Sequence, residues 1–354
     1  MRCQELVGGL RARGHVCGVL TSDFRLKDVP DGEEPLVWRS LSLEANVYHY
    51  RPFDHLARHP WCLRHNLNAL HAVVAAFEPD LVFVWGMWNL SPVLPAEAER
   101  LYPGRVAYSF AGYWPLEPDP HEQYWLGQDG RRPGKIFRRL IGPLALSRLY
   151  RPVTARSLRF EHAITCSRFV LERLQAGGLH IPHARVVFSG IDVQRFRPTD
   201  EKPITDRLRV LHVGGFVTHK GADVAIQAVA ALVRDGHRNI ELTIVGRGHP
   251  DYRRRLEAMI AADGLGSWVR LAEGVPRTRM TEIYRQHDVL VLPTSTDEPL
   301  SRAVMEGMAS GLVVVATDTG GTPEMITHGQ DGLLFKPGDS SALADHLRLL
   351  LTNP

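Results

Sequence analysis

Short apolar runs alternate with helical patterns along the whole chain. Several of these runs are unbroken stretches of Val, Leu and Ile, such as LVVVA at 312–316. Unbroken runs are typical of parallel strands, because helices cover both faces of a parallel sheet. Twelve runs are predicted to be strands: residues 15–21, 36–41, 81–86, 105–110, 162–166, 185–188, 208–215, 240–246, 268–273, 288–294, 312–318 and 332–335.

The segments between these runs favour helices. ADVAIQAVAALVRDG at 222–236, for example, has apolar residues at helical spacing. Strands that alternate with helices predict an α/β fold, and twelve strands are too many for one doubly wound sheet. The Pro- and charge-rich residues 196–207 are therefore predicted to link one domain at 1–195 to a second at 208–354. Ligands of open α/β sheets bind at the carboxyl ends of the strands, so a site is expected there.

Composition sets limits on the function. The chain of 354 residues is long enough for two domains, and its net charge of +3 does not indicate nucleic-acid binding. Cys3, Cys17, Cys62 and Cys166 are widely spaced, which indicates neither a zinc site nor a disulfide framework. The first residues contain no apolar signal sequence. A reducing compartment, the cytoplasm, is the expected location.

One segment departs from this balanced charge. Residues 131–159 contain nine Arg or Lys and no Asp or Glu, with apolar residues interspersed. A basic amphipathic segment can bind the anionic inner face of a membrane. A solvated helix face with a basic rim for an anionic substrate is the other explanation. It is favoured here, because apolar and basic residues are not cleanly separated at helical spacing.

Two predicted strands end in glycine-containing turns. Gly214 and Gly215 precede Lys220, and Gly246 precedes Arg247. Glycine lets a backbone approach a ligand closely, and a lysine charge suits a phosphate. Tight strand-to-helix connections with a solvated lysine would explain the same residues. Neither turn matches a Walker or dinucleotide-binding motif.

The segment TSTDEPLSRAVMEGMASG, residues 294–311, carries two glutamates eight positions apart. A helix is predicted to begin close to Pro299, because proline is favoured in a first helical turn. Glu298 would then precede the helix and Glu306 would lie about two turns inside it, too far away to share a proton. The N–H groups at such a helix start suit an anion. Taken alone, the pair is better explained as a carboxylate that complements the helix dipole and an ordinary helical glutamate.

Six segments between 208 and 339 occur in a characteristic order: VGGF…HKG, TIVGRG, VRLAEGVPRTRMTEIYRQHDVLVLPT, EPLSRAVMEGMASG, VVVATDTGGTPEMI and DGLLFKPGD. This region resembles the donor-binding half of glycosyltransferase family 4, whose members are retaining, use nucleotide sugars and have the GT-B fold. The first half of the chain resembles the acceptor domain more loosely, in ELVGGLRARGHVCGVLT, AITCSRFVLERL and SGIDVQRFRP. The resemblance implies an α/β fold of two doubly wound Rossmann-like domains that face each other across a cleft.

The resemblance also implies roles for individual residues. Glu306 would accept hydrogen bonds from the donor's ribose hydroxyls, and Glu298 would lie near the transferred sugar. Lys220 would hold the diphosphate and stabilise the leaving group, so Glu298 and Lys220 are the expected catalytic residues. Further donor contacts would fall to Gly214, Gly215, Gly246, Arg247, Leu300, Ser301, Arg302, Gly320 and Gly321.

The implied reaction transfers a sugar from a UDP- or GDP-sugar, with retention at the anomeric carbon. The acceptor would be a sugar, a lipid or a small molecule, and no metal or other cofactor is expected. No carboxylate nucleophile of the kind used by retaining glycosidases is established in the family. The leaving diphosphate is instead thought to help activate the acceptor.

Several positions depart from the family pattern. Gly215 stands where the family usually has an arginine that shares the diphosphate with the lysine, and Arg247 or Arg302 would have to replace it. Ala111 and Gly112 stand where many members have His-Asp. The family's first strand and its glycine-rich loop have no counterpart before the chain begins, and relatives continue beyond its last predicted helix.

These departures leave an alternative to the active enzyme. The chain could be a truncated relative, weakly active or inactive, that binds nucleotide sugar without turnover. A dinucleotide-dependent oxidoreductase shares the strand pattern. It is disfavoured, because no G-x-G-x-x-G follows a first strand.

Overall fold

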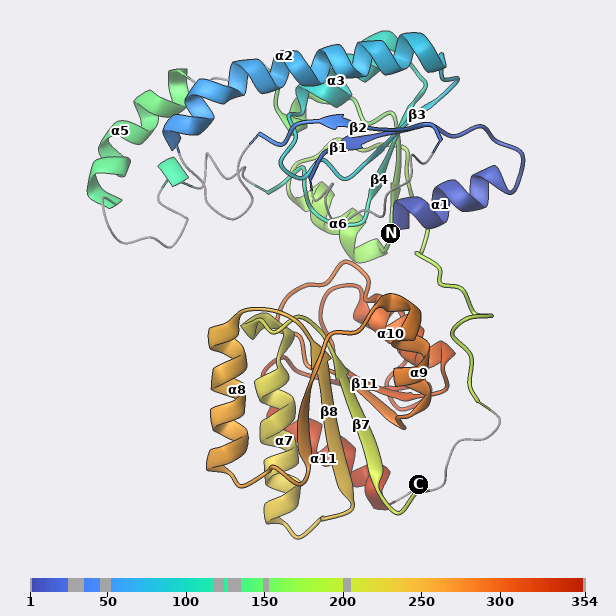
Figure 1. The fold of residues 1–354 in the computed structure, drawn as a ribbon, viewed down its shortest axis with the longest axis vertical. Helices are drawn as coiled ribbons and strands as arrows, with labels where there is room; N and C mark the ends of the chain where they lie inside the picture. The colour runs from blue at the N-terminus through green and yellow to red at the C-terminus, as the bar shows by residue number, and fades with distance from the viewer. Residues whose placement is uncertain are drawn as a thin grey trace. The chain divides into compact units, whose positions relative to one another are not determined.

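The protein forms two compact α/β units, which we describe separately (Figure 1). The first contains Met1–Thr165 with Leu171–Val186, and the second contains Cys166–Val170 with Val187–Pro354. The segment at 196–207, predicted from sequence to be a linker, falls within the second unit by this division. The computed structural model describes residues 2–24, 35–44, 52–117, 124–126, 135–148, 153–199 and 205–352.

All twelve predicted strands are present. The strands of the first unit are β1 (Val19–Ser22), β2 (Val37–Leu41), β3 (Val82–Trp85), β4 (Val106–Phe110), β5 (His162–Thr165) and β6 (Ala184–Val186). Those of the second unit are β7 (Leu208–Val213), β8 (Ile240–Gly246), β9 (Val269–Glu273), β10 (Val289–Leu292), β11 (Val313–Thr317) and β12 (Leu333–Phe335).

Helices separate most of these strands. They are α1 (Arg2–Arg11), α2 (Pro52–Phe77), α3 (Val93–Leu101), α5 (Lys135–Arg148), α6 (Arg168–Ala176), α7 (Ala222–Arg234), α8 (Pro250–Ala262), α9 (Met280–Arg285), α10 (Arg302–Ala309) and α11 (Ser340–Thr352). The helix expected at 222–236 is α7.

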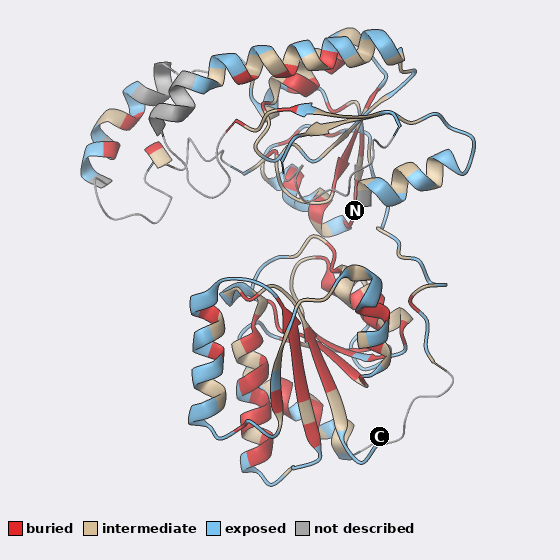
Figure 2. Cartoon of the chain, in the orientation of Figure 1, coloured by how far each residue is buried: buried red, intermediate tan, exposed pale blue. Residues whose placement is uncertain are grey.

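The second unit is built on one parallel sheet with the strand order β9-β8-β7-β10-β11-β12. In chain order this is 3-2-1-4-5-6, the doubly wound Rossmann arrangement. The central strands are buried along most of their length, which explains their unbroken apolar sequences (Figure 2).

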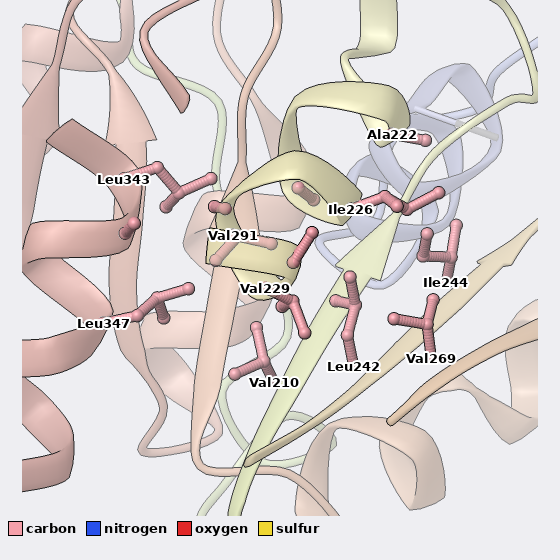
Figure 3. Close-up of a cluster of buried hydrophobic side chains, with 14 of the residues drawn as sticks. Val210, Ala222, Ile226, Val229, Leu242, Ile244, Val269, Val291, Leu343 and Leu347 are labelled. Atoms are coloured by element: carbon pink, nitrogen blue, oxygen red, sulfur yellow. The ribbon is translucent and has the colours of Figure 1, made fainter. Parts of the chain in front are cut away.

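Side chains along each central strand alternate between two cores. Val210, Val291 and Val315 point into a core with α7, α8 and α11, part of which is drawn in Figure 3. Their neighbours Leu211 and Leu290 point the other way, into a core that includes residues of α9 and α10. Because successive strand residues face opposite sides, two layers of helices cover the sheet.

The first unit has a four-stranded parallel sheet, β3-β4-β5-β6, and a separate parallel pair, β1-β2. Strands β1 and β3 contain no buried residue, unlike the central strands of the second unit, whereas β4 is mostly buried. Ala111 and Gly112 directly follow β4, at the carboxyl end of the sheet. Helix α2 packs against β2, and Leu41, Leu70 and Leu94 form a small core there.

Candidate functional site

The expected site residues of the second unit gather where its strand order reverses. Strands β7 and β10 are hydrogen-bonded neighbours, but the chain continues from β7 to β8 on one side and from β10 to β11 on the other. The loops after β7 and β10 therefore leave in opposite directions at the carboxyl end of the sheet, the place where doubly wound sheets bind ligands. The β7 loop carries Lys220, and the β10 loop carries Glu298.

Backbone contacts fix these two loops against each other. The Ser295 N–H and the Thr294 hydroxyl both donate to the His219 carbonyl, at 2.9 and 3.0 Å. Gly221 has a φ of +70°, and a Cβ there would collide with the Pro293 carbonyl. Glycine is the residue that permits both the left-handed conformation and the close approach. The position of Lys220 relative to the β10 loop is thus set by the backbone.

An ion pair joins the loops after β7 and β10. We call this place, where the strand order reverses, the reversal point. The Lys220 ammonium donates to Glu298 Oε1, and the two side chains are 27% and 15% exposed. Both groups are therefore partly shielded from water but accessible at the carboxyl end of the sheet. The structure brings together the two residues that the resemblance identified as catalytic, from positions 78 residues apart.

The helix after Glu298 begins later than the sequence suggested. Pro299 is not in its first turn: α10 begins at Arg302, and Ser301 is its N-cap residue. The segment from 297 to 299 packs against a glycine turn instead, and the helix begins only after it. Glu306 consequently lies just over one turn inside α10 rather than two.

Gly320 and Gly321 form that glycine turn. The Gly321 N–H donates to the Glu298 carbonyl at 2.8 Å. A Cβ on Gly320 would collide with the Glu298 backbone, and one on Gly321 would collide with the Pro299 carbonyl. Two glycines are needed here so that the turn can support the loop that carries Glu298.

Leu300, Ser301 and Arg302 lie at the start of α10, as expected. Leu300 and Ser301 are buried, and the Ser301 side chain makes no capping hydrogen bond to the helix. The N–H groups in the first turn of a helix have no partner within the helix, so this end suits an anion.

Glu306 is held by several protein groups. Only 5% of the residue is exposed. Arg277 Nη2 donates to its Oε1 at 2.6 Å, and the Tyr284 hydroxyl donates to its Oε2 at 3.2 Å. Arg302 Nε lies 3.5 Å from Oε1. Each carboxylate oxygen can accept two hydrogen bonds, so these contacts leave acceptor capacity for a ribose hydroxyl. The role of Glu306 toward a ribose stays a prediction.

Tyr284 is fully buried beside Glu306. Burial, and then the charge of the neighbouring carboxylate, raise the pKa of Tyr284 well above its ordinary value. The phenol therefore keeps its proton at neutral pH and remains a hydrogen-bond donor to Glu306.

The glycines after β7 and β8 bring these two loops into contact. A Cβ on Gly246 would collide with the Gly214 carbonyl, and the Phe216 N–H donates to the Arg247 carbonyl at 2.9 Å. Gly215 lies beside the same carbonyl. The exposed Arg247 side chain lies beside Gly274, which follows β9. Of the two arginines considered as replacements at Gly215, Arg302 instead lies beside Glu306.

A buried histidine lies beneath the β7 loop. His212 is fully buried on β7, and its Nδ1 lies 3.2 Å from the Val291 carbonyl. Burial lowers the pKa of His212 to about 4, so the ring is neutral at physiological pH. Nδ1 then carries the hydrogen that meets the carbonyl, which makes Nε2 an acceptor. Nε2 lies next to Gly214 and has no hydrogen-bond partner among the residues that the structure describes.

Sequence reasoning did not assign Arg277, Tyr284 or His212. The first two lie in the segment VRLAEGVPRTRMTEIYRQHDVLVLPT, which carries part of the family resemblance. No local spacing connects them to Glu306, which is 29 and 22 residues away. His212 was counted as part of an apolar strand.

Residues 194–354 match the family of glycosyl transferases group 1. The amylovoran biosynthesis glycosyltransferase AmsK of Erwinia amylovora is 32% identical over 189 residues, which cover 52% of this chain and 46% of that protein. The chain thus matches about half the length of this curated relative.

Solved structures share the fold over a longer stretch. A glycosyltransferase of Rickettsia africae superposes with a TM-score of 0.73 at 18% identity, over 99% of this chain and 84% of that one. HepE of Anabaena, solved in complex with UDP and glucose, has a TM-score of 0.59 at 20% identity, over 81% of this chain and 72% of that one.

The fold is therefore that of the GT-B glycosyltransferases, with two Rossmann-like units of α/β structure. The matched residues 194–354 carry the reversal point and both glutamates. The expected resemblance to a glycosyltransferase family is confirmed, and the finer assignment to family 4 stays a prediction.

Proposed function

We propose that the chain is a retaining glycosyltransferase that moves a sugar from a UDP- or GDP-sugar to an acceptor hydroxyl. The observation that carries the proposal is the Lys220–Glu298 pair across the reversal point, beside the first turn of α10. The UDP complex of HepE supports a uridine nucleotide as one donor candidate. The name of AmsK supports a role in glycan synthesis.

In this proposal the diphosphate lies between the Lys220 ammonium and the N–H groups at the start of α10. An ammonium has three donors, so Lys220 can keep Glu298 and bind a phosphate oxygen at the same time. The bond from the anomeric carbon to the β-phosphate oxygen breaks, and its electrons stay on the phosphate. Lys220 stabilises that growing negative charge in a partly shielded site.

The acceptor oxygen then bonds to the anomeric carbon on the face that the phosphate leaves, which retains the configuration. Its proton passes to the leaving phosphate oxygen. In this proposal Glu298, held by Lys220, lies next to the transferred sugar and accepts hydrogen bonds from the sugar hydroxyls. None of these steps uses a metal ion.

The alternative is a relative that binds nucleotide sugar without turnover. Gly215 favours it, because one cation of the family pattern is absent there and Arg302 lies beside Glu306 instead. Binding and turnover must therefore be measured separately.

A calorimetric screen of UDP, GDP and ADP, followed by UDP or GDP release from the matching sugars, tests the proposal. We expect saturable binding of UDP or GDP, and nucleotide release that rises when acceptor glycans are added. Binding without release would favour the alternative. A folded protein that binds no nucleotide would contradict both functions.

A further inference from the structure

One face of helix α5 packs against Tyr124 and Trp125. The Arg138 guanidinium lies 4.7 Å from the centre of the Tyr124 ring and donates to the Tyr124 carbonyl at 3.4 Å. Gly142, one turn further on, is so close to the Trp125 carbonyl that a Cβ would lie 2.6 Å from it. Both Arg138 and Gly142 are buried, which orients the helix.

The opposite face of α5 presents large apolar side chains to solvent. Ile136 is 80% exposed, Leu140 76% and Phe137 63%. At about 100° per residue, these three positions fall within an arc of about 100°, and Arg138 lies about 100° beyond its edge. Three large apolar residues on one exposed helical face form a contiguous patch, unlike the single exposed apolar residues found on ordinary surfaces.

In the sequence, the segment that contains α5 carries charge of one sign. Residues 131–159 contain nine Arg or Lys and no Asp or Glu, and Lys135 and Arg139 lie within α5 itself. A positive segment with an exposed apolar arc is complementary to an anionic lipid surface, whose headgroups attract the cations while the interface accepts the apolar side chains. The arrangement separates one apolar face more cleanly than the sequence pattern indicated.

We propose that α5 docks this protein on the surface of an anionic membrane, with Ile136, Phe137 and Leu140 in the interface. A helix of 14 residues is about 21 Å long, shorter than the hydrocarbon core of about 30 Å, so it lies on the bilayer. Within the described ranges of the chain, no helix is long and apolar enough to cross a membrane. This inference does not depend on the proposed transferase activity.

Vesicle flotation of the full chain tests the docking. We expect binding to phosphatidylcholine vesicles that contain phosphatidylglycerol, at least tenfold tighter than to pure phosphatidylcholine vesicles, and weaker at high salt. The double substitution Ile136→Gln and Leu140→Gln should reduce that binding at least tenfold. Leu349→Gln, at an exposed apolar position of α11, is the matched control and should bind as the unchanged protein does.

Equal melting temperatures of the double variant and the unchanged protein would show that lost binding is not lost folding. Docking is overturned if the unchanged protein does not float with anionic vesicles, or if the double variant floats equally well. It is also overturned if sedimentation without lipid shows a dimer that the double variant converts to a monomer, because a second copy would then cover the patch. A nucleotide titration of the same samples tests the transferase proposal separately.

Discussion

The two glutamates of the segment at 294–311 lie in different surroundings, although only eight residues separate them. Glu298 is on a loop and pairs with one lysine at the carboxyl end of the sheet. Glu306 is inside α10, nearly buried, and accepts from Arg277 and Tyr284. The loop carboxylate can exchange its partner with an incoming ligand, whereas the helical carboxylate is part of the packed structure. The two glutamates of this segment thus differ in their contacts, and substitution of each residue can distinguish their roles.

Removal of the Glu306 carboxylate should have the largest effect. Glu306→Ala leaves the buried Tyr284 hydroxyl and the Arg277 guanidinium without their acceptor, which should lower the free energy of unfolding by about 3–5 kcal/mol. Chemical denaturation measures this loss, and most nucleotide binding should disappear with it.

Glu306→Gln separates stability from binding. The amide keeps the shape and one acceptor oxygen, so a smaller loss of stability is expected, about 1–2 kcal/mol. Binding of UDP should still weaken by about tenfold or more, because a ribose hydroxyl would lose a charged acceptor. Unchanged UDP affinity in this variant would refute the ribose role.

His212 is buried beneath the β7 loop, and the free energy of unfolding of the protein should therefore depend on pH. The pKa of His212 is about 4 in the folded protein and close to 6.5 when unfolded, so the unfolded chain binds the extra proton between these values. The stability from the neutral, buried ring is therefore fully present above pH 6.5 and is lost as the pH falls toward 4, about 3 kcal/mol in all.

His212→Gln should flatten this part of the pH profile, measured as the free energy of unfolding between pH 4 and 7. An unchanged slope in His212→Gln would show that other groups cause the acid sensitivity.

Lys220→Ala should weaken UDP binding by roughly 10–100-fold, because a charged hydrogen bond to phosphate contributes about 1.5–3 kcal/mol. Lys336→Ala is the matched control. Lys336 also pairs with a carboxylate, Asp318 at 2.7 Å, but its side chain is largely in solvent. Calorimetry should give the control the affinity of the unchanged protein; equal losses in both variants would mean that Lys220 has no special contact with the ligand.

Glu298→Gln should have the smallest effect on nucleotide binding. The substitution frees Lys220 from a competing carboxylate, so UDP should bind about two- to threefold more tightly, in line with the modest strength of partly exposed ion pairs. Sugar transfer should nevertheless slow by at least tenfold. Weaker UDP binding would place Glu298 on the nucleotide instead of the sugar.

The sequence predicted the strands well because their environment is uniform. A parallel strand buried on both faces must be apolar throughout, so β10 and β11 could be recognised without any knowledge of their neighbours. The positions of Lys220 and Glu298 at strand ends followed from the same pattern. The start of α10 was misplaced, because the turn at Gly320–Gly321 holds the chain at Pro299 from a distant part of the sequence.

The surroundings of Glu306 could not be predicted in this way. Its partners Arg277 and Tyr284 come from the η4–α9 region before β10, where η4 comprises Arg277–Arg279, and only the folded sheet brings them to α10. The exposed face of α5 could not be predicted either, because the buried contacts of Arg138 and Gly142 decide which side of that helix faces solvent.

A crystal structure of the protein with bound UDP tests the central claim most directly. The account predicts that the β-phosphate lies within hydrogen-bond distance of the Lys220 ammonium at the start of α10, with a ribose hydroxyl on the Glu306 carboxylate. UDP bound away from the reversal point between β7 and β10, with the Lys220–Glu298 pair and the Glu306 contacts untouched, would contradict it.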